Sequence, residues 1–154
     1  MLQTIREQIR NNKYTLKGIM TDHVLTVHPQ TTLKDIAHLF LRYRISGVPV
    51  VDDQKKIVGI ITATDLFDLL KMVIRDSGAE HVFESGYMLT ANDIMVREVM
   101  TIHEDTPLED VIDVMISKNI HTLPVVRDTD VVGIVGRRDI LNAVFQGFMA
   151  QQSE

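Results

Sequence analysis

Two short segments place polar side chains directly after an apolar run that is typical of a β-strand. They are residues 59–65 (GIITATD) and residues 133–139 (GIVGRRD). A hydroxyl at the mouth of a following helix would assist phosphate binding, because free N–H groups and the helix dipole favour anions there. A carboxylate can accept hydrogen bonds from two adjacent hydroxyl groups. In the first segment, Thr62 and Asp65 would supply this chemistry, or one of them would simply cap the helix.

The second segment keeps the carboxylate and changes the rest. Gly136 stands where the first segment has Thr62, so one hydrogen bond to a ligand is lost, whereas Asp139 matches Asp65. Arg137 and Arg138 could replace the hydroxyl by charge, because a guanidinium forks well onto phosphate. Equally, both could be solvated side chains at a helix start, where the dipole slightly disfavours cations. The sequence leaves these alternatives open.

The cysteine and histidine content and the absence of common catalytic motifs argue against a metal site and against an enzyme. The chain has no cysteine, and its six histidines form no His-x-x-x-His pair, so we predict no metal site. A P-loop, a nucleophile elbow and a zinc-protease motif are all absent, so an enzyme is the least favoured class. His28 and His103 occupy equal positions ahead of two helix starts, which favours a paired structural role or a solvated turn over metal binding.

Composition limits the partners and the compartment. A formal net charge of −5 argues against a protein that binds nucleic-acid backbone. No apolar run approaches the length of a membrane span, and the N-terminus lacks the core of a signal peptide. We therefore expect a cytoplasmic protein with no membrane insertion.

The chain contains an internal repeat that must position the polar segments. Shifted by 75 positions, residues 19–53 align with residues 94–128 without a gap, and after one deleted residue the match continues to Asp65 and Asp139. Each copy predicts a β-α-β-β-α unit. The expected elements of the first copy are a short strand at 26–27, a helix over 33–40, a hairpin of 48–51 and 57–61, and a helix over 65–75. Those of the second are a strand at 101–102, a helix over 108–115, a hairpin of 123–126 and 131–135, and a helix over 139–149.

The two hairpins, "SGVPVVDDQKKIVGIITATD" and "HTLPVVRDTDVVGIVGRRD", resemble the CBS domain in a tandem pair, the Bateman module. We accordingly expect an α/β (α+β) fold in which two repeats pack sheet to sheet with pseudo-twofold symmetry. The expected divisions are an N-terminal helix in 1–16, repeat 1 in 17–75, a linker in 76–92 and repeat 2 in 93–150.

The resemblance implies a regulatory ligand that contains adenosine, such as AMP, ADP or ATP, with S-adenosylmethionine or a dinucleotide as alternatives. It also implies that each of two clefts between the repeats takes a ribose-binding Asp from one repeat and an adenine pocket from the other. The first cleft would then contain Thr62, Asp65, Thr106, Val111, His121, Thr122 and Val132. The second would contain Asp139, Arg138, Thr31, Ile36, Ser46, Gly47 and Val58. The apolar members of both sets fit equally well as core residues, and the first cleft keeps the fuller motif.

The resemblance further implies a homodimer that lacks catalytic activity and acts on a separate effector protein. The helices over 66–72 and 140–148 are the natural contact surfaces between copies. A different class remains open, namely an interaction scaffold that dimerises and holds a partner without binding any ligand. The substitution of Gly136 for the motif hydroxyl favours that alternative.

Overall fold

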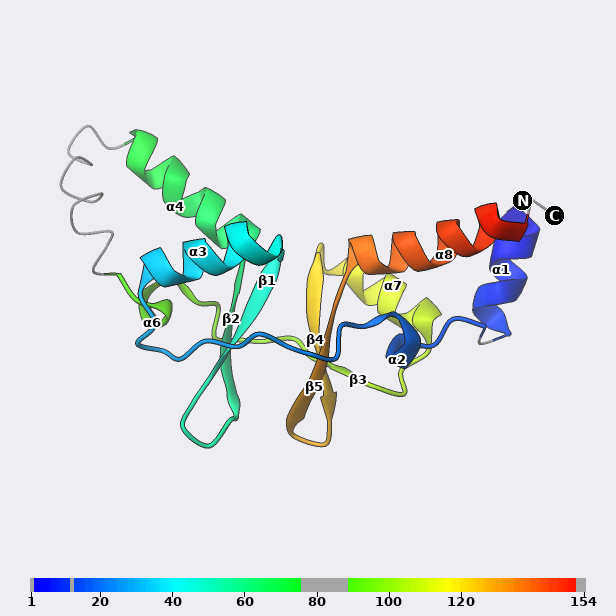
Figure 1. Ribbon diagram of the computed structural model, residues 1–154, viewed down its shortest axis with the longest axis horizontal. Coiled ribbons are helices and arrows are strands. Elements are labelled where there is room, and N and C mark those ends of the chain that lie inside the picture. Colours follow the sequence, from blue (N-terminus) through cyan, green and yellow to red (C-terminus); the bar gives the residue numbers. More distant parts are fainter. Residues whose placement is uncertain (1, 12, 76–88, 152–154) are drawn as a thin grey trace. The chain divides into compact units, whose positions relative to one another are not determined.

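The structure is a computed structural model that describes residues 2–11, 13–75 and 89–151 (Figure 1). Two compact units make up the chain. The central unit is Leu25–Val99, and the terminal unit combines Met1–Val24 with Met100–Glu154. Residues 76–88, which form most of the predicted linker, lie outside the described residues.

The central unit is built on an antiparallel hairpin whose strands are apolar except for Thr62 at the end of β2. The β1 strand is completely buried, and Val48, Val50 and Ile61 are fully enclosed. A bulge between Val50 and Val51 shifts the register near the turn. The elements of this unit are α3 (Leu33–Tyr43), β1 (Gly47–Val51), β2 (Ile57–Thr62), α4 (Ala63–Arg75) and α6 (Ala91–Ile94).

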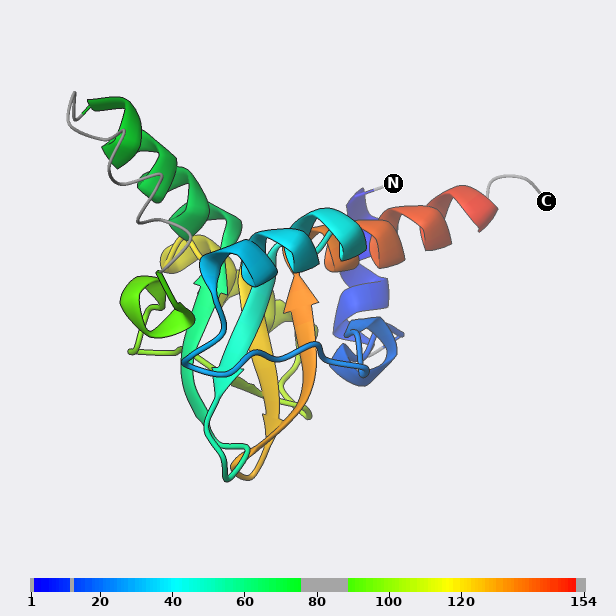
Figure 2. The same cartoon turned by 60° about the vertical axis from the view of Figure 1, so that its left-hand side comes forward.

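The terminal unit repeats this plan and adds helices from the N-terminus. Its hairpin carries the equivalent bulge between Val125 and Val126, and β3 adds a third, parallel strand. Helix α1 contacts α7, and α2 contacts α8 (Figure 2). The elements are α1 (Leu2–Arg10), α2 (Leu16–Ile19), β3 (Ile102–His103), α7 (Leu108–Ser117), β4 (Thr122–Arg127), β5 (Asp130–Gly136) and α8 (Arg137–Gln151).

The predicted elements are present, with small differences at their ends. The strand expected at 26–27 is a single parallel bridge between Val27 and Val50. The helices expected from Asp65 and Asp139 start two residues earlier, at Ala63 and Arg137. Both aspartates therefore occupy the third helical position, from which a carboxylate can reach back to the residue before the helix.

Each hairpin is completed by the first residues of the other repeat. In the terminal unit, Thr21 and Ile134 exchange two backbone hydrogen bonds of 2.9 Å. In the central unit, Val96 and Ile60 form the equivalent pair at 2.9 and 3.0 Å. The terminal unit is therefore made of two separate stretches of chain, whereas the central unit is continuous.

Candidate functional site

The strand-to-helix junction of the central unit fixes the carboxylate of Asp65. Strand β2 ends at Thr62, and α4 begins at the next residue. Asp65 Oδ2 accepts hydrogen bonds from the Thr62 backbone N–H at 2.6 Å and from the Thr62 hydroxyl at 2.7 Å. Both bonds use the same oxygen, so Oδ1 keeps its lone pairs for another partner. The proton of the Thr62 hydroxyl points to Asp65, so Thr62 positions this carboxylate.

The same geometry occurs at a helix for which no ligand is predicted. Asp93 Oδ2 accepts bonds from the backbone N–H and the hydroxyl of Thr90, both at 2.8 Å. The backbone bond and then the hydroxyl bond hold the pKa of Asp93 below its usual value. A Thr-x-x-Asp junction therefore serves as a helix cap by itself, and the cap interpretation of Asp65 fits the observed contacts.

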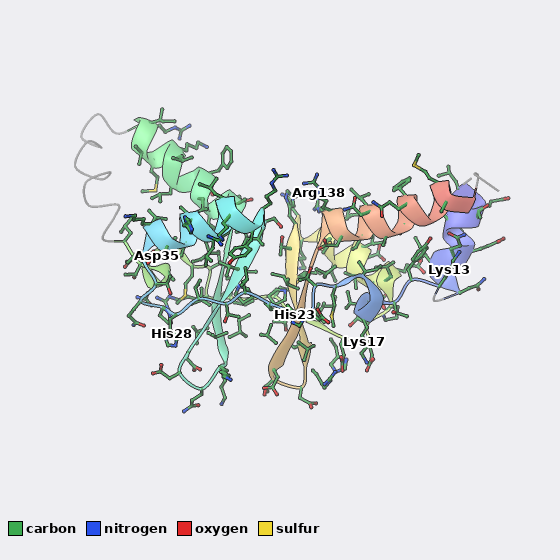
Figure 3. The ribbon with its side chains drawn as sticks, in the orientation of Figure 1. Lys13, Lys17, His23, His28, Asp35 and Arg138 are labelled. Atoms are coloured by element: carbon green, nitrogen blue, oxygen red, sulfur yellow. The ribbon has the colours of Figure 1, made fainter. Side chains whose placement is uncertain are left out.

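The junction of the terminal unit holds its carboxylate more loosely. Asp139 Oδ2 accepts one bond there, from the Gly136 backbone N–H at 2.7 Å, because Gly136 supplies no hydroxyl. Arg137 points its guanidinium at the end of α7, donating to the carbonyls of Met115 at 2.6 Å and Ile120 at 3.0 Å. Arg138 is exposed in the first turn of α8 (Figure 3). Both arginines had the same two possible roles in the sequence, but their surroundings differ. Arg137 is hydrogen-bonded to carbonyl groups, and Arg138 is exposed.

The candidate pocket residues of the central unit lie in two places. Gly47 pairs with Thr62 across the hairpin, and the Ser46 carbonyl accepts the Ala63 N–H at 3.0 Å, so these two residues lie beside the Asp65 junction. Ile36 has 0% exposure in the apolar core, and Val58 packs partly buried against the same core. The Thr31 hydroxyl accepts the His28 N–H at 3.0 Å and closes a turn before α3.

The terminal unit shows the same separation. Thr122 is buried and pairs with Gly136, and the carbonyl of the exposed His121 accepts the Arg137 N–H at 3.0 Å. Val111 is fully buried in the core, against which Val132 packs. The Thr106 N–H donates to His103 in a turn before α7. Among the predicted contacts, Ile36 and Val111 therefore lie in core positions, and their contact with a ligand stays a prediction.

An ionic cluster around one buried carboxylate in the terminal unit was not anticipated from the sequence. Glu104 is 5% exposed and accepts a forked pair of bonds from Arg127, at 2.5 and 2.8 Å. Lys17 Nζ lies 3.5 Å from Glu104 and 3.0 Å from Asp105. The Arg127 hydrogen bond is the main cause that lowers the pKa of Glu104 to about 2. In repeat 1, Pro29 corresponds to Glu104 and Asp52 corresponds to Arg127. A charged pair that is present in only one of the two repeats was the feature of the sequence that could have indicated this cluster.

The described residues contain no group of three or more potential metal ligands of the His, Cys, Asp or Glu type. His28 Nε2 lies 3.3 Å from Asp53, whereas His103 Nδ1 accepts the Asp105 N–H at 3.3 Å. His103 thus contacts a neighbour in its own turn, whereas His28 lies beside Asp53 in the turn between β1 and β2. His81 lies outside the described residues. Within the same limits, no helix is long and apolar enough to cross a membrane.

The family model for the CBS domain matches residues 16–72 and 91–146. The chain belongs to the CBS domain family. The plant CBS protein CBSX2 of Arabidopsis thaliana, solved in complex with AMP, has a TM-score of 0.70 and 26% identity over 88% of this chain and 98% of that one. The CBS domain pair of protein MJ0100, solved with 5′-methylthioadenosine and S-adenosylmethionine, has a TM-score of 0.72 and 32% identity over the same shares. These likenesses confirm the α/β fold of two CBS repeats.

Curated relatives place this pair inside longer proteins. Inosine-5′-monophosphate dehydrogenase of Methanocaldococcus jannaschii is 30% identical over 141 residues, which is 90% of this chain and 25% of the dehydrogenase. The chain spans 25%, 36% and 22% of the lengths of the first three curated relatives. The CBS pair is therefore the part that this chain shares with them.

Proposed function

We propose that this CBS pair is a regulatory module that binds an adenosine-containing ligand of the AMP, ADP or ATP type. The observation that carries the proposal is that two similar CBS pairs are solved with adenosine compounds, namely AMP in one and methylthioadenosine with S-adenosylmethionine in the other. The Asp65 junction supports it, because Oδ1 has no bond to Thr62 and is available for a ribose hydroxyl.

Each unit would contribute one carboxylate and one loop to ligand binding. Asp65 with Thr62, and Asp139 with Arg138, would bind the ribose and phosphate parts. The loop residues Ser46 and Gly47, or His121 and Thr122, would contact the base. The remaining proposed contacts are Thr31, Ile36 and Val58 in the central unit and Thr106, Val111 and Val132 in the terminal unit.

The test is titration calorimetry of the purified protein with AMP, ADP, ATP and S-adenosylmethionine, using the wild type and Asp65→Ala. Loss of the carboxylate should weaken binding by on the order of 2–4 kcal/mol, because two charged hydrogen bonds to the ribose disappear. Asp93→Ala is the matched control, since it removes the same pair of bonds from another helix start.

Both variants should lower stability, and only Asp65→Ala should lower affinity. Equal affinities in all three proteins would show that Asp65 is a cap and not a ligand contact. No binding of any of the four compounds by the wild type would refute the nucleotide-binding function itself.

A second candidate is a dimerisation scaffold, and one observation favours it. Helix α4 presents large apolar side chains on its outer side as well as inward, with Phe67 72% and Ile74 83% exposed. Exposed large apolar side chains that gather on one surface often mark a site of protein–protein contact. Leu141, Phe145 and Met149 of α8 are also exposed. We infer that these helices meet a second copy of the chain, as a homodimer that acts on a separate effector protein without catalysis of its own.

Sedimentation velocity, combined with the calorimetric titrations, distinguishes the two candidates. Phe67→Glu should shift a wild-type dimer to monomer, whereas Lys118→Glu, at an exposed position outside both helices, should leave it dimeric. A wild-type protein that is monomeric at micromolar concentration would refute the homodimer. A dimer that binds none of the four compounds would favour the scaffold.

A further inference from the structure

The Arg137 side chain joins the start of α8 to the end of α7. Its Nη2 donates to the Met115 carbonyl at 2.6 Å, and its Nε donates to the Ile120 carbonyl at 3.0 Å. Its backbone N–H also donates to the His121 carbonyl at 3.0 Å. Three donors of one residue therefore hold the segment that leaves α7 and enters β4.

The Met115 carbonyl lies in the last turn of α7, where a helix normally lacks hydrogen-bond donors. Helix α7 ends at Ser117, and Asn119 turns the chain in the left-handed region with φ of 52°. The last carbonyls of a helix have no intrahelical donor, and a cation is favoured there by the dipole. The Met115 carbonyl also accepts the Ile120 N–H at 3.0 Å. The backbone hydrogen bond from Ile120 to Met115 already closes this turn, and the Arg137 side chain adds two further hydrogen bonds to it.

The other repeat provides an internal comparison. Ala63 occupies the position of Arg137, and its N–H makes the equivalent backbone bond to the Ser46 carbonyl at 3.0 Å. Ala63 has no side chain that could reach the end of α3, where Arg44 adopts the left-handed conformation with φ of 51°. The guanidinium contacts are therefore specific to the turn that precedes His121 and Thr122.

We propose that Arg137 is a positioning residue that fixes the segment Ile120–Thr122 in the conformation in which it contacts the ligand. This inference rests on the proposed nucleotide-binding function, in which His121 and Thr122 face the base. A segment that is already ordered loses less conformational freedom on binding, and this gain appears as affinity. Arg137 would act in this way without contacting the nucleotide.

The variant Arg137→Ala installs the residue that the other repeat has at this position. We expect a three- to tenfold weaker affinity, which corresponds to about 0.7–1.4 kcal/mol of restored ordering cost. Arg6→Ala is the control, because it removes an equal charge from an exposed position in α1 of the same unit, outside the proposed ligand contacts. Arg137→Lys keeps the charge and loses the planar fork, so its affinity should fall between those of the wild type and Arg137→Ala.

Two measurements test the proposal on the intact chain. The first is calorimetric titration with AMP, well below the unfolding temperature of every variant. The second is hydrogen exchange of the amides of residues 119–123 without ligand, which a loss of global stability alone would not single out. We expect faster exchange at these amides and weaker AMP binding in Arg137→Ala, with neither change in Arg6→Ala.

Other outcomes contradict the inference in distinct ways. If Arg137→Ala unfolds at lower temperature but keeps both its AMP affinity and its local exchange rate, Arg137 is only a structural residue. Faster exchange with unchanged AMP affinity would show that Arg137 orders the turn but that this order does not contribute to ligand binding. If the wild type binds no AMP, the proposed function fails for that ligand, and the inference fails with it even if the exchange changes.

Discussion

Met95 packs over Gly59 of strand β2 so closely that a Cβ atom on this glycine would lie 2.4 Å from the Met95 sulfur. The other repeat shows the same relationship, with the Met20 sulfur 2.4 Å from a Cβ placed on Gly133. In both units, the methionine belongs to the first residues of the other repeat. The glycine thus allows that segment to approach the hairpin and form its backbone pair.

We predict that Gly59→Ala destabilises the protein by about 1–3 kcal/mol, because the added methyl group overpacks the contact with Met95. Urea unfolding would measure this loss. The double variant Gly59→Ala with Met95→Ala should be less destabilised than the sum of the two single variants, since the clash is then removed. Strict additivity would show that the close approach is not the cause.

The hydroxyl of Thr62 should matter for ligand affinity through Asp65. Thr62→Val leaves Asp65 with the single backbone bond that Asp139 has, so we expect up to tenfold weaker nucleotide binding, the worth of one ordinary hydrogen bond. Thr62→Ser should bind like the wild type. The reciprocal change, Gly136→Thr, should strengthen binding at Asp139, since Gly136 has no positive φ that would exclude threonine. Calorimetry that finds Thr62→Ser as weak as Thr62→Val would contradict this account.

Ile36 should behave as a core residue. Its side chain is fully buried among apolar residues of the central unit, so Ile36→Ala should cost about 2–5 kcal/mol of stability through lost burial and a cavity. The conservative variant Ile36→Val should cost about 0.5–1.5 kcal/mol. Unfolding curves give both values. A nucleotide affinity that falls in Ile36→Val, in which the fold is nearly intact, would instead support the ligand contact inferred from the family.

Stability should decrease in acid because of Glu104. Its pKa lies at about 2 in the folded protein, below the ordinary value of 4.5. A carboxyl with a depressed folded pKa stabilises the fold above its unfolded pKa and loses that contribution as pH falls. The stability difference between wild type and Glu104→Gln should therefore be largest near pH 7 and shrink between pH 4.5 and 2.

Urea unfolding at several pH values checks this expectation. Glu109→Gln, at a side chain that is 56% exposed in a loose ion pair with Arg10, is the control and should show a smaller difference at neutral pH. A difference between wild type and Glu104→Gln that stays constant down to pH 3 would mean that the charge of Glu104 does not stabilise this cluster.

The sequence by itself determined the repeated elements and their order. Apolar runs that contain Pro49 and Pro124, polar turns and helical spacing are local patterns, and they sufficed to predict both hairpins and the helices around them. They also located Asp65 and Asp139 at the strand-to-helix junctions. The exact helix starts were missed by two residues, because a third-position carboxylate and a capping residue look alike in sequence.

Only the tertiary structure decided which parts complete each unit and what several side chains do there. The pairs Met20 with Gly133 and Met95 with Gly59 join residues far apart in the chain, and no local pattern specifies such contacts. Arg137 and Arg138 are adjacent and identical in type, yet only the first meets the carbonyls at the end of α7. A periodic pattern can show that Ile36 faces inward, but its complete burial depends on what packs against that face. Local sequence sets the conformation of an element, whereas the role of a side chain depends on neighbours that folding brings from elsewhere.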